Sequence, residues 1–111
     1  MNKLTESTLR EMTQAIVQEV QPAAVVLFGS RAHGGTRADS DVDLLVVERE
    51  PFGGSRSRRL EISRIRKVLS SFGVAKDILV YSRDEVERWR DSLNHIIATA
   101  FREGRVLYAA E

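Results

Sequence analysis

The stretch from Leu27 to Val47 reads LFGSRAHGGTRADSDVDLLVV and holds the features that decide the fold. It begins inside the apolar run Ala23–Phe28, which predicts a buried strand because it is short and closed by Gly29. The segment Gly29–Ser40 contains three glycines and many small polar residues, which predicts a loop. Asp41–Val47 alternates in a way that predicts a second strand. The length of the loop leaves open whether these two strands run parallel or antiparallel.

The rest of the chain alternates helical and strand patterns around this stretch. An apolar stripe over residues 5–20 predicts a helix that Thr5 caps and Pro22 ends. A second helix is expected from about Ser57 to Phe72, with Gly73 as its C-terminal cap, followed by a strand at Val74–Tyr81. A capping box at Ser82–Glu85 predicts one long helix that runs to Gly104. Val106–Tyr108 is expected to add a short edge strand or to pack as a tail. This order indicates an α/β (α+β) fold in which helices flank a small sheet.

Length and composition limit the classes of protein that fit. The 111 residues give room for one domain, so we expect residues 1–111 to form a single unit. The 17 basic and 16 acidic side chains leave a net charge of +1, which makes nucleic acid unexpected as the main partner. The absence of cysteine excludes disulfides, thiolate zinc sites and cysteine nucleophiles. The apolar runs are too short to cross a membrane, so we expect a soluble, cytoplasmic protein.

The carboxylates of the second strand are the main candidates for chemistry. Asp41 and Asp43 are two residues apart, so their side chains share one face of a strand, with Cα atoms about 6.5 Å apart. Two carboxylates this close repel each other unless a cation lies between them, and Mg²⁺ suits one or two carboxylates completed by water and phosphate. Asp77, inside a later apolar strand, is the natural third ligand.

Each of these features alone also has a structural explanation. Asp-x-Asp can mark a strand entry, Gly29-Ser30 can be turn chemistry, and Asp77 can face solvent at a sheet edge. Their combination favours a site, because the ten residues between Ser30 and Asp41 let the loop return the turn to the carboxylates. Other phosphate-binding and hydrolase patterns, namely the P-loop, the Rossmann glycines and the Gly-x-Ser-x-Gly elbow, are absent.

This combination resembles the nucleotidyltransferase superfamily of the DNA polymerase β type. The family signature is a Gly-Ser turn, about ten residues, Asp-x-Asp in a strand and a third Asp in a later strand. Here it stands as LFGSRAHGGTRADSDVDLLVV followed by VAKDILVY. The small size, the Ser-Arg-Ala-x-Gly continuation and the terminal EGRVLY are similar to the minimal nucleotidyltransferases, the MntA-type antitoxins of HEPN/MNT toxin–antitoxin pairs. His33 stands where many relatives carry a second basic residue.

The resemblance implies a palm-like mixed sheet and catalysis with two Mg²⁺ ions. Asp41, Asp43 and Asp77 would be the metal ligands and catalytic residues, with Asp77 helping to deprotonate an attacking hydroxyl. Gly29 and Ser30 would bind the phosphates of a nucleoside triphosphate, ATP being the expected one. Arg31 would add charge to the triphosphate or brace the loop.

The resemblance also implies a partner. A helical HEPN-domain toxin would accept AMP on a tyrosine and be neutralised, although self-association into a homo-oligomer is an alternative source of the acceptor site. Two other functions remain open. The chain could be a nucleotide-binding module that masks its partner without catalysis, or it could modify a small molecule such as an aminoglycoside.

Two further features carry structural interpretations. The segment Arg56–Lys67 holds six basic residues against Glu61 and is interpreted as a solvated helix face, with docking to an acidic partner or RNA as the alternative. Trp89 lies on the apolar stripe of the last helix and is predicted to be a core residue.

Overall fold

The computed structural model describes residues 5–29, 42–89, 91 and 96–110. Its centre is a four-stranded sheet in the order β3-β2-β1-β4. The strands are β1 (Ala24–Phe28), β2 (Val42–Glu48), β3 (Lys76–Ser82) and β4 (Arg105–Ala109). β1 pairs antiparallel with both β2 and β4, whereas β2 and β3 pair in parallel. The expected mixed sheet is therefore confirmed, and the first two strands run antiparallel.

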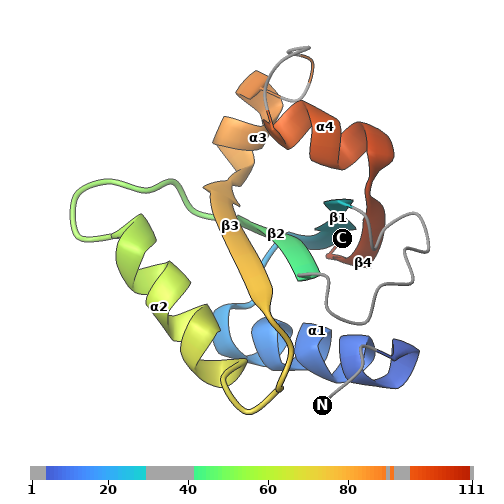
Figure 1. Ribbon diagram of the computed structural model, residues 1–111. Coiled ribbons are helices and arrows are strands. Elements are labelled where there is room, and N and C mark those ends of the chain that lie inside the picture. The colour runs from blue at the N-terminus through green and yellow to red at the C-terminus, as the bar shows by residue number, and fades with distance from the viewer. Residues whose placement is uncertain (1–4, 30–41, 90, 92–95, 111) are drawn as a thin grey trace.

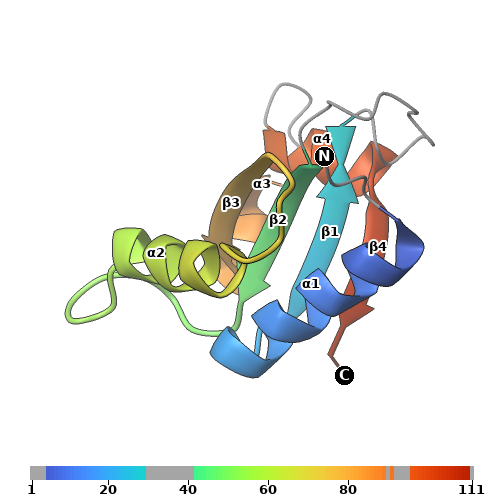
Figure 2. The same cartoon turned by 60° about the horizontal axis from the view of Figure 1, so that its bottom comes forward.

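Helices cover both faces of the sheet (Figures 1 and 2). On one face lie α1 (Glu6–Val20) and α2 (Arg58–Val68), which bury Leu9, Met12, Ile16 and Ile65 against the strands. On the other face lie α3 (Arg83–Trp89) and α4 (Ile96–Glu103). Their buried residues Val86, Ile97 and Ala100 join Val26, Phe28, Leu45 and Val47 in a second cluster. Successive side chains of β2 therefore pack alternately into the two cores, because neighbouring residues of a strand point to opposite faces.

The N-terminal helix begins and ends where the sequence predicts. The Thr5 hydroxyl accepts a hydrogen bond of 3.0 Å from the backbone N–H of Thr8, which satisfies one of the unpaired donors of the first turn. At the other end, Gln21 adopts a left-handed conformation with φ of 48° and donates its N–H to the carbonyl of Val17.

The second helix is shorter than predicted. It ends at Val68, with Leu69 as its C-terminal cap, so the predicted end at Phe72 and the cap at Gly73 are wrong. Ser70 accounts for the early stop, because both its backbone N–H and its hydroxyl donate to the carbonyl of Lys67, at 3.2 and 2.7 Å. These bonds close tighter turns than the α-helix and leave its ladder without a continuation.

The predicted long helix after Ser82 is wrong as well. The Glu85 carboxylate accepts from the N–H of Ser82 at 2.9 Å, as the capping box predicts, but the helix ends at Trp89 and α4 begins at Ile96. Each helix presents its own apolar face, α3 to β2 and β3 and α4 to β1. The spacing of apolar residues in the sequence continues from the first helix to the second, so it gives no sign that they are separate helices. Trp89, predicted to be core, is 39% exposed.

The end of the chain forms the edge strand that the sequence suggested. Gly104 joins α4 to β4 in a confined space, where an added Cβ would lie 2.2 Å from the carbonyl oxygen of Ala100 and 2.9 Å from that of Leu27.

We expect Gly104→Ala to lower the free energy of unfolding by about 3 kcal/mol, since backbone atoms cannot yield as side chains can. Gly54→Ala, with a positive φ but nothing within 4 Å, should lower it by only about 1 kcal/mol. Urea denaturation measures both, and an equal cost for the two variants would contradict this view of Gly104.

A buried carboxyl makes stability depend on pH. Glu48, the last residue of β2, is 3% exposed; its Oε1 accepts from Arg56 at 3.2 Å, while Oε2 has no hydrogen-bond partner among the described residues. Burial and the neighbouring carboxyl of Glu61 raise the pKa of Glu48 to about 7. The native state then holds this proton more tightly than the unfolded chain, so stability should fall as pH rises from about 4.5 to about 7.

The Glu48→Gln variant tests this dependence. Its free energy of unfolding should lack the part of the pH slope that Glu48 contributes, because the amide does not ionise. Subtracting the free energies of unfolding of the variant from those of the wild type at each pH removes the contribution of all groups that the two proteins share. A difference that stays constant between pH 4.5 and 7 would show that Glu48 does not titrate in this range.

Candidate active site

Asp43 and Asp77 lie side by side at one end of the sheet. The parallel register of β2 and β3 pairs Asp43 with Asp77 directly. Neighbouring strands are about 4.8 Å apart, and residues that pair across them project from the same face. That face is the one which α3 and α4 cover, because two residues further along Leu45 belongs to the core beneath these helices and Leu79 packs against it. Asp43 is half-buried and Asp77 is exposed.

Gly29 lies against the carboxylate of Asp43. It follows the last residue of β1, Phe28, which pairs with Asp43 across the antiparallel ladder. Its φ is 76°, in the left-handed region, and an added Cβ would lie 2.2 Å from Asp43 Oδ2. A side chain at this position would meet both a strained backbone and the carboxylate, so glycine is required here. The family resemblance predicts that Gly29 binds phosphate, but the sequence gives no sign of this close approach.

The other expected site residues, Ser30, Arg31 and Asp41, lie outside the described residues, as do His33 and His95. Asp41 directly precedes Val42, the first residue of β2. Within the described part of the chain, no group of three or more His, Cys, Asp or Glu residues could hold a metal ion. The described chain therefore brings together Gly29, Asp43 and Asp77 of the expected set.

The chemistry of this arrangement fits a magnesium ion. Asp43 and Asp77 present carboxylates on one face of the sheet, and Gly29 lies against the carboxylate of Asp43. Mg²⁺ binds through one or two carboxylates and keeps its other positions for water and phosphate oxygens.

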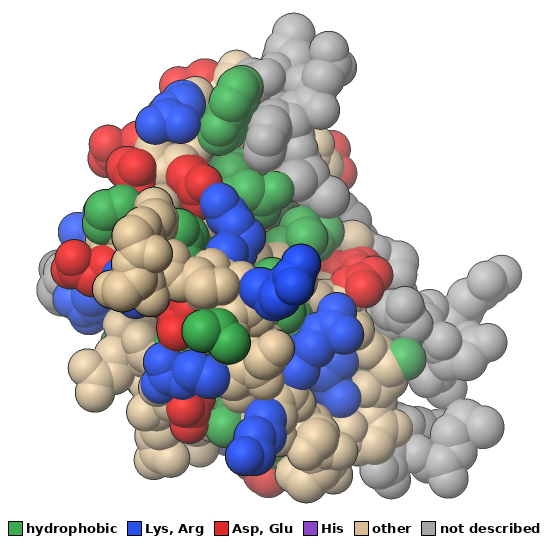
Figure 3. Space-filling view, turned by 90° about the vertical axis from the view of Figure 1, so that its left-hand side faces the viewer, with side chains coloured by type: hydrophobic (Ala, Val, Ile, Leu, Met, Phe, Trp, Pro, Cys, Tyr) green, Lys and Arg blue, Asp and Glu red, His purple; other side chains and the backbone are tan. Residues whose placement is uncertain are grey.

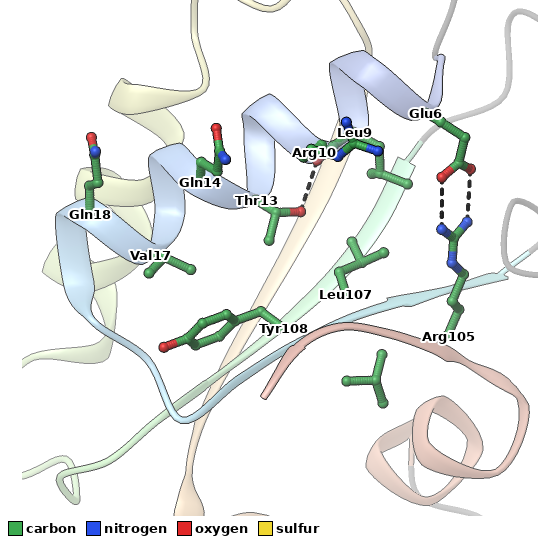
Figure 4. Close-up of a pocket in the computed structure, with 11 residues that line it drawn as sticks. Glu6, Leu9, Arg10, Thr13, Gln14, Val17, Gln18, Arg105, Leu107 and Tyr108 are labelled. Carbon is green, nitrogen blue, oxygen red and sulfur yellow. Dashed lines mark hydrogen bonds and ion pairs between the residues drawn. The ribbon is translucent and has the colours of Figure 1, made fainter. Parts of the chain in front are cut away.

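A groove lies elsewhere, between α1 and β4 (Figure 4). It has a volume of about 630 Å³, with Leu9, Val17 and Leu107 among its lining and Gln14 and Gln18 along α1. A bidentate ion pair between Glu6 and Arg105, at 2.7 and 2.8 Å, spans it. Because α1 and the Asp43–Asp77 pair belong to opposite faces of the sheet, this groove is not part of the carboxylate site.

The basic segment around α2 is partly neutralised by acidic side chains, most of which lie in other helices and strands. Arg56 pairs with Glu48, Arg58 pairs with Glu85 through bonds of 2.9 and 2.6 Å, and Arg64 pairs with Glu19 and Glu61. Figure 3, which faces this side of the molecule, shows basic and acidic groups interspersed. The interpretation as a solvated face holds for the exposed residues Arg59, Arg66 and Lys67. Arg58 and Arg64 also join α2 to the neighbouring helices through Glu85 and Glu19, and Arg56 joins the turn before α2 to Glu48.

In the described ranges, no helix has the length and apolar character needed to cross a membrane. The pair of Asp43 and Asp77, on the sheet face that α3 and α4 cover, is the candidate centre for chemistry.

Solved structures of similar fold include nucleotidyltransferases and antitoxin complexes. A putative nucleotidyltransferase from Sulfolobus solfataricus is 17% identical, with a TM-score of 0.59 over 91% of this chain and 77% of its own. A toxin–antitoxin structure with AMP-PNP is 15% identical, with a TM-score of 0.59 over 92% and 74%. A complex of tri-AMPylated Shewanella oneidensis HEPN toxin with MNT antitoxin is 13% identical, with a TM-score of 0.54 over 95% and 70%. At these identities the likeness shows the fold.

The sequence itself identifies the family. No curated protein matches the chain. The sequence model of one protein family, the nucleotidyltransferase domain, does match residues 9–107 of the chain. This range includes all four strands except the last two residues of β4. The chain therefore belongs to the nucleotidyltransferase domain family.

Proposed function

We propose that this chain is a magnesium-dependent nucleotidyltransferase that transfers AMP from ATP to a hydroxyl group, namely a tyrosine of a partner HEPN toxin, and so acts as an antitoxin. The observation that carries the proposal is the pairing of Asp43 with Asp77 beside Gly29. Family membership supports the reaction class. We further propose that residues 1–111 form one domain and that the protein acts in the cytoplasm.

Each site residue has a distinct part in the proposed reaction. Asp41, Asp43 and Asp77 would hold two Mg²⁺ ions, which would supply positive charge to a reaction in which negative charge develops on phosphate oxygens. The N–H of Gly29 and the hydroxyl of Ser30 bind the phosphates, and Arg31 adds positive charge beside them. Asp77, which is exposed, receives the proton of the acceptor hydroxyl. The acceptor oxygen forms a bond to the α phosphorus. The bond between the α phosphorus and the oxygen that bridges it to the β phosphorus breaks, and pyrophosphate leaves.

The proposed partner comes from relatives of the same fold. One of them is an MNT antitoxin in complex with a tri-AMPylated HEPN toxin, and another toxin–antitoxin structure holds AMP-PNP. These relatives support ATP as the substrate and a toxin side chain as the acceptor. Self-association, the alternative source of an acceptor site, predicts label on the chain itself.

Asp77→Asn should abolish nucleotidyl transfer while leaving the fold intact, because Asp77 is exposed at the start of an edge strand. The assay follows label from ATP, carried on either the α or the γ phosphate, into protein of a lysate from the source organism. We expect covalent label from the α phosphate alone, lost in Asp77→Asn and kept in Glu11→Gln, which removes an exposed carboxylate on α1. Label from the γ phosphate would instead indicate phosphoryl transfer. Toxin neutralisation that survives Asp77→Asn would indicate masking without catalysis.

Gly29→Ala should reduce transfer at least about 100-fold, because the methyl group displaces either the Asp43 carboxylate or the turn that binds the phosphates. Gly54→Ala is the matched control, since it also places alanine at a positive φ but meets no neighbouring atom. Transfer rates, measured at matched folded fractions, should fall only for Gly29→Ala. Equal rates for the two variants would contradict the placement of Gly29 in the site.

A further inference from the structure

Trp89 is one of three large apolar side chains that the described part of the chain leaves exposed. Leu60 on α2 is 62% exposed, Val106 on β4 is 57% exposed, and Trp89 on α3 is 39% exposed. Leu60 and Val106 belong to α2 and to the edge strand β4. Trp89 belongs to the helical layer that covers the face of Asp43 and Asp77. Of these three exposed side chains, Trp89 is therefore the one placed to contact a ligand that binds Asp43 and Asp77.

The course of α3 brings Trp89 back toward the end of the sheet that carries the carboxylates. The helix begins directly after Ser82, the last residue of β3, and contacts both β3 and β2. In Figure 2, the end of α3 lies at the end of the sheet where β1 finishes and where β2 and β3 begin. Asp43 and Asp77 are each the second residue of their strand, so they lie at this same end.

The residue one turn earlier fixes which side of α3 faces the sheet. Val86 is buried in the core that contains Leu45, with Leu79 packed against it. Leu45 and Leu79 are two residues beyond Asp43 and Asp77 on the same face. Trp89, at a spacing of three, continues the sheet-facing side of the helix by one further turn toward the carboxylates.

We propose that Trp89 stacks on the purine base of the nucleotide whose phosphates the carboxylate end of the sheet holds. This inference rests on the proposed function. A nucleoside triphosphate extends from its metal-bound phosphates past the sugar to the base, and the α3–α4 layer lies above that end of the sheet. An indole ring offers a flat apolar face to any base, which gives affinity without hydrogen-bond readout. Trp89 then binds ATP and GTP alike and discriminates little between them.

The chain contains a single tryptophan, so its fluorescence reports on this position alone. Wild-type protein is titrated with ATP and, separately, with inorganic tripolyphosphate, both in the presence of Mg²⁺. Tripolyphosphate offers the same phosphate groups without a base. We expect ATP to quench the fluorescence of Trp89 and tripolyphosphate to bind with little change.

Calorimetric titration of variants supplies the second measurement. Trp89→Ala should bind ATP about tenfold more weakly and tripolyphosphate as tightly as the wild type does. Trp89→Phe, which keeps an aromatic ring, should recover most of the loss. Leu60→Ala, which removes an exposed apolar side chain on α2, should bind both ligands normally. Circular dichroism confirms that each variant is folded.

The outcomes separate this inference from the proposed function. If both ligands bind, and Trp89→Ala weakens neither or weakens both equally, stacking is wrong and the phosphate site stands. Equal quenching by ATP and tripolyphosphate would also overturn stacking, because the signal would then come from the phosphates. If neither ligand binds the folded wild-type protein with Mg²⁺, the proposed function fails, and the role of Trp89 fails with it.

Discussion

The parallel register between β2 and β3 is the constraint on which the candidate site depends. It places Asp43 opposite Asp77, although 33 residues separate them in the sequence. A slip of one residue would turn Asp77 toward the core under α1 and α2, where Ile78 and Val80 now pack, and would move Ile78 to the exposed position that Asp77 now holds. Burial of the two cores therefore fixes the register, and the register fixes the pair of carboxylates.

The crossover that permits this register is secured by one arginine. Arg58, at the start of α2, donates to the carbonyl of Val80 at 2.9 Å and to both oxygens of Glu85. Its guanidinium lies over the rings of Phe52 and Tyr81, at 4.8 and 5.2 Å from their centres. The hydrogen bonds that Arg58 donates to Glu85 lower the pKa of this carboxyl to about 2. One side chain thus joins the turn after β2, the end of β3 and the start of α3.

The sequence predicts those parts of the fold that depend on local patterns. The strand before Gly29, the spacing to Asp43 and the cap at Thr5 are local, and the structure has them where expected. Other features depend on contacts between distant segments. The pairing of Arg56, Arg58 and Arg64 with carboxylates is one of these, since Glu48, Glu85 and Glu19 lie in other elements. The break between α3 and α4 is another, because α3 packs on β2 and β3 and α4 packs on β1, while the apolar spacing in the sequence continues from one helix to the next.

The closeness of Gly29 to Asp43 limits how such a site can arise. The site needs three strands together, because Asp43 lies on β2, Asp77 lies on β3 and Gly29 directly follows β1. β3 is an edge strand, held by β2 on one side only. Edge strands open more readily than central ones, and parallel pairs between distant segments form late in folding. Each opening of that edge takes the carboxylates apart, so the lifetime of the site is the lifetime of the β2–β3 ladder.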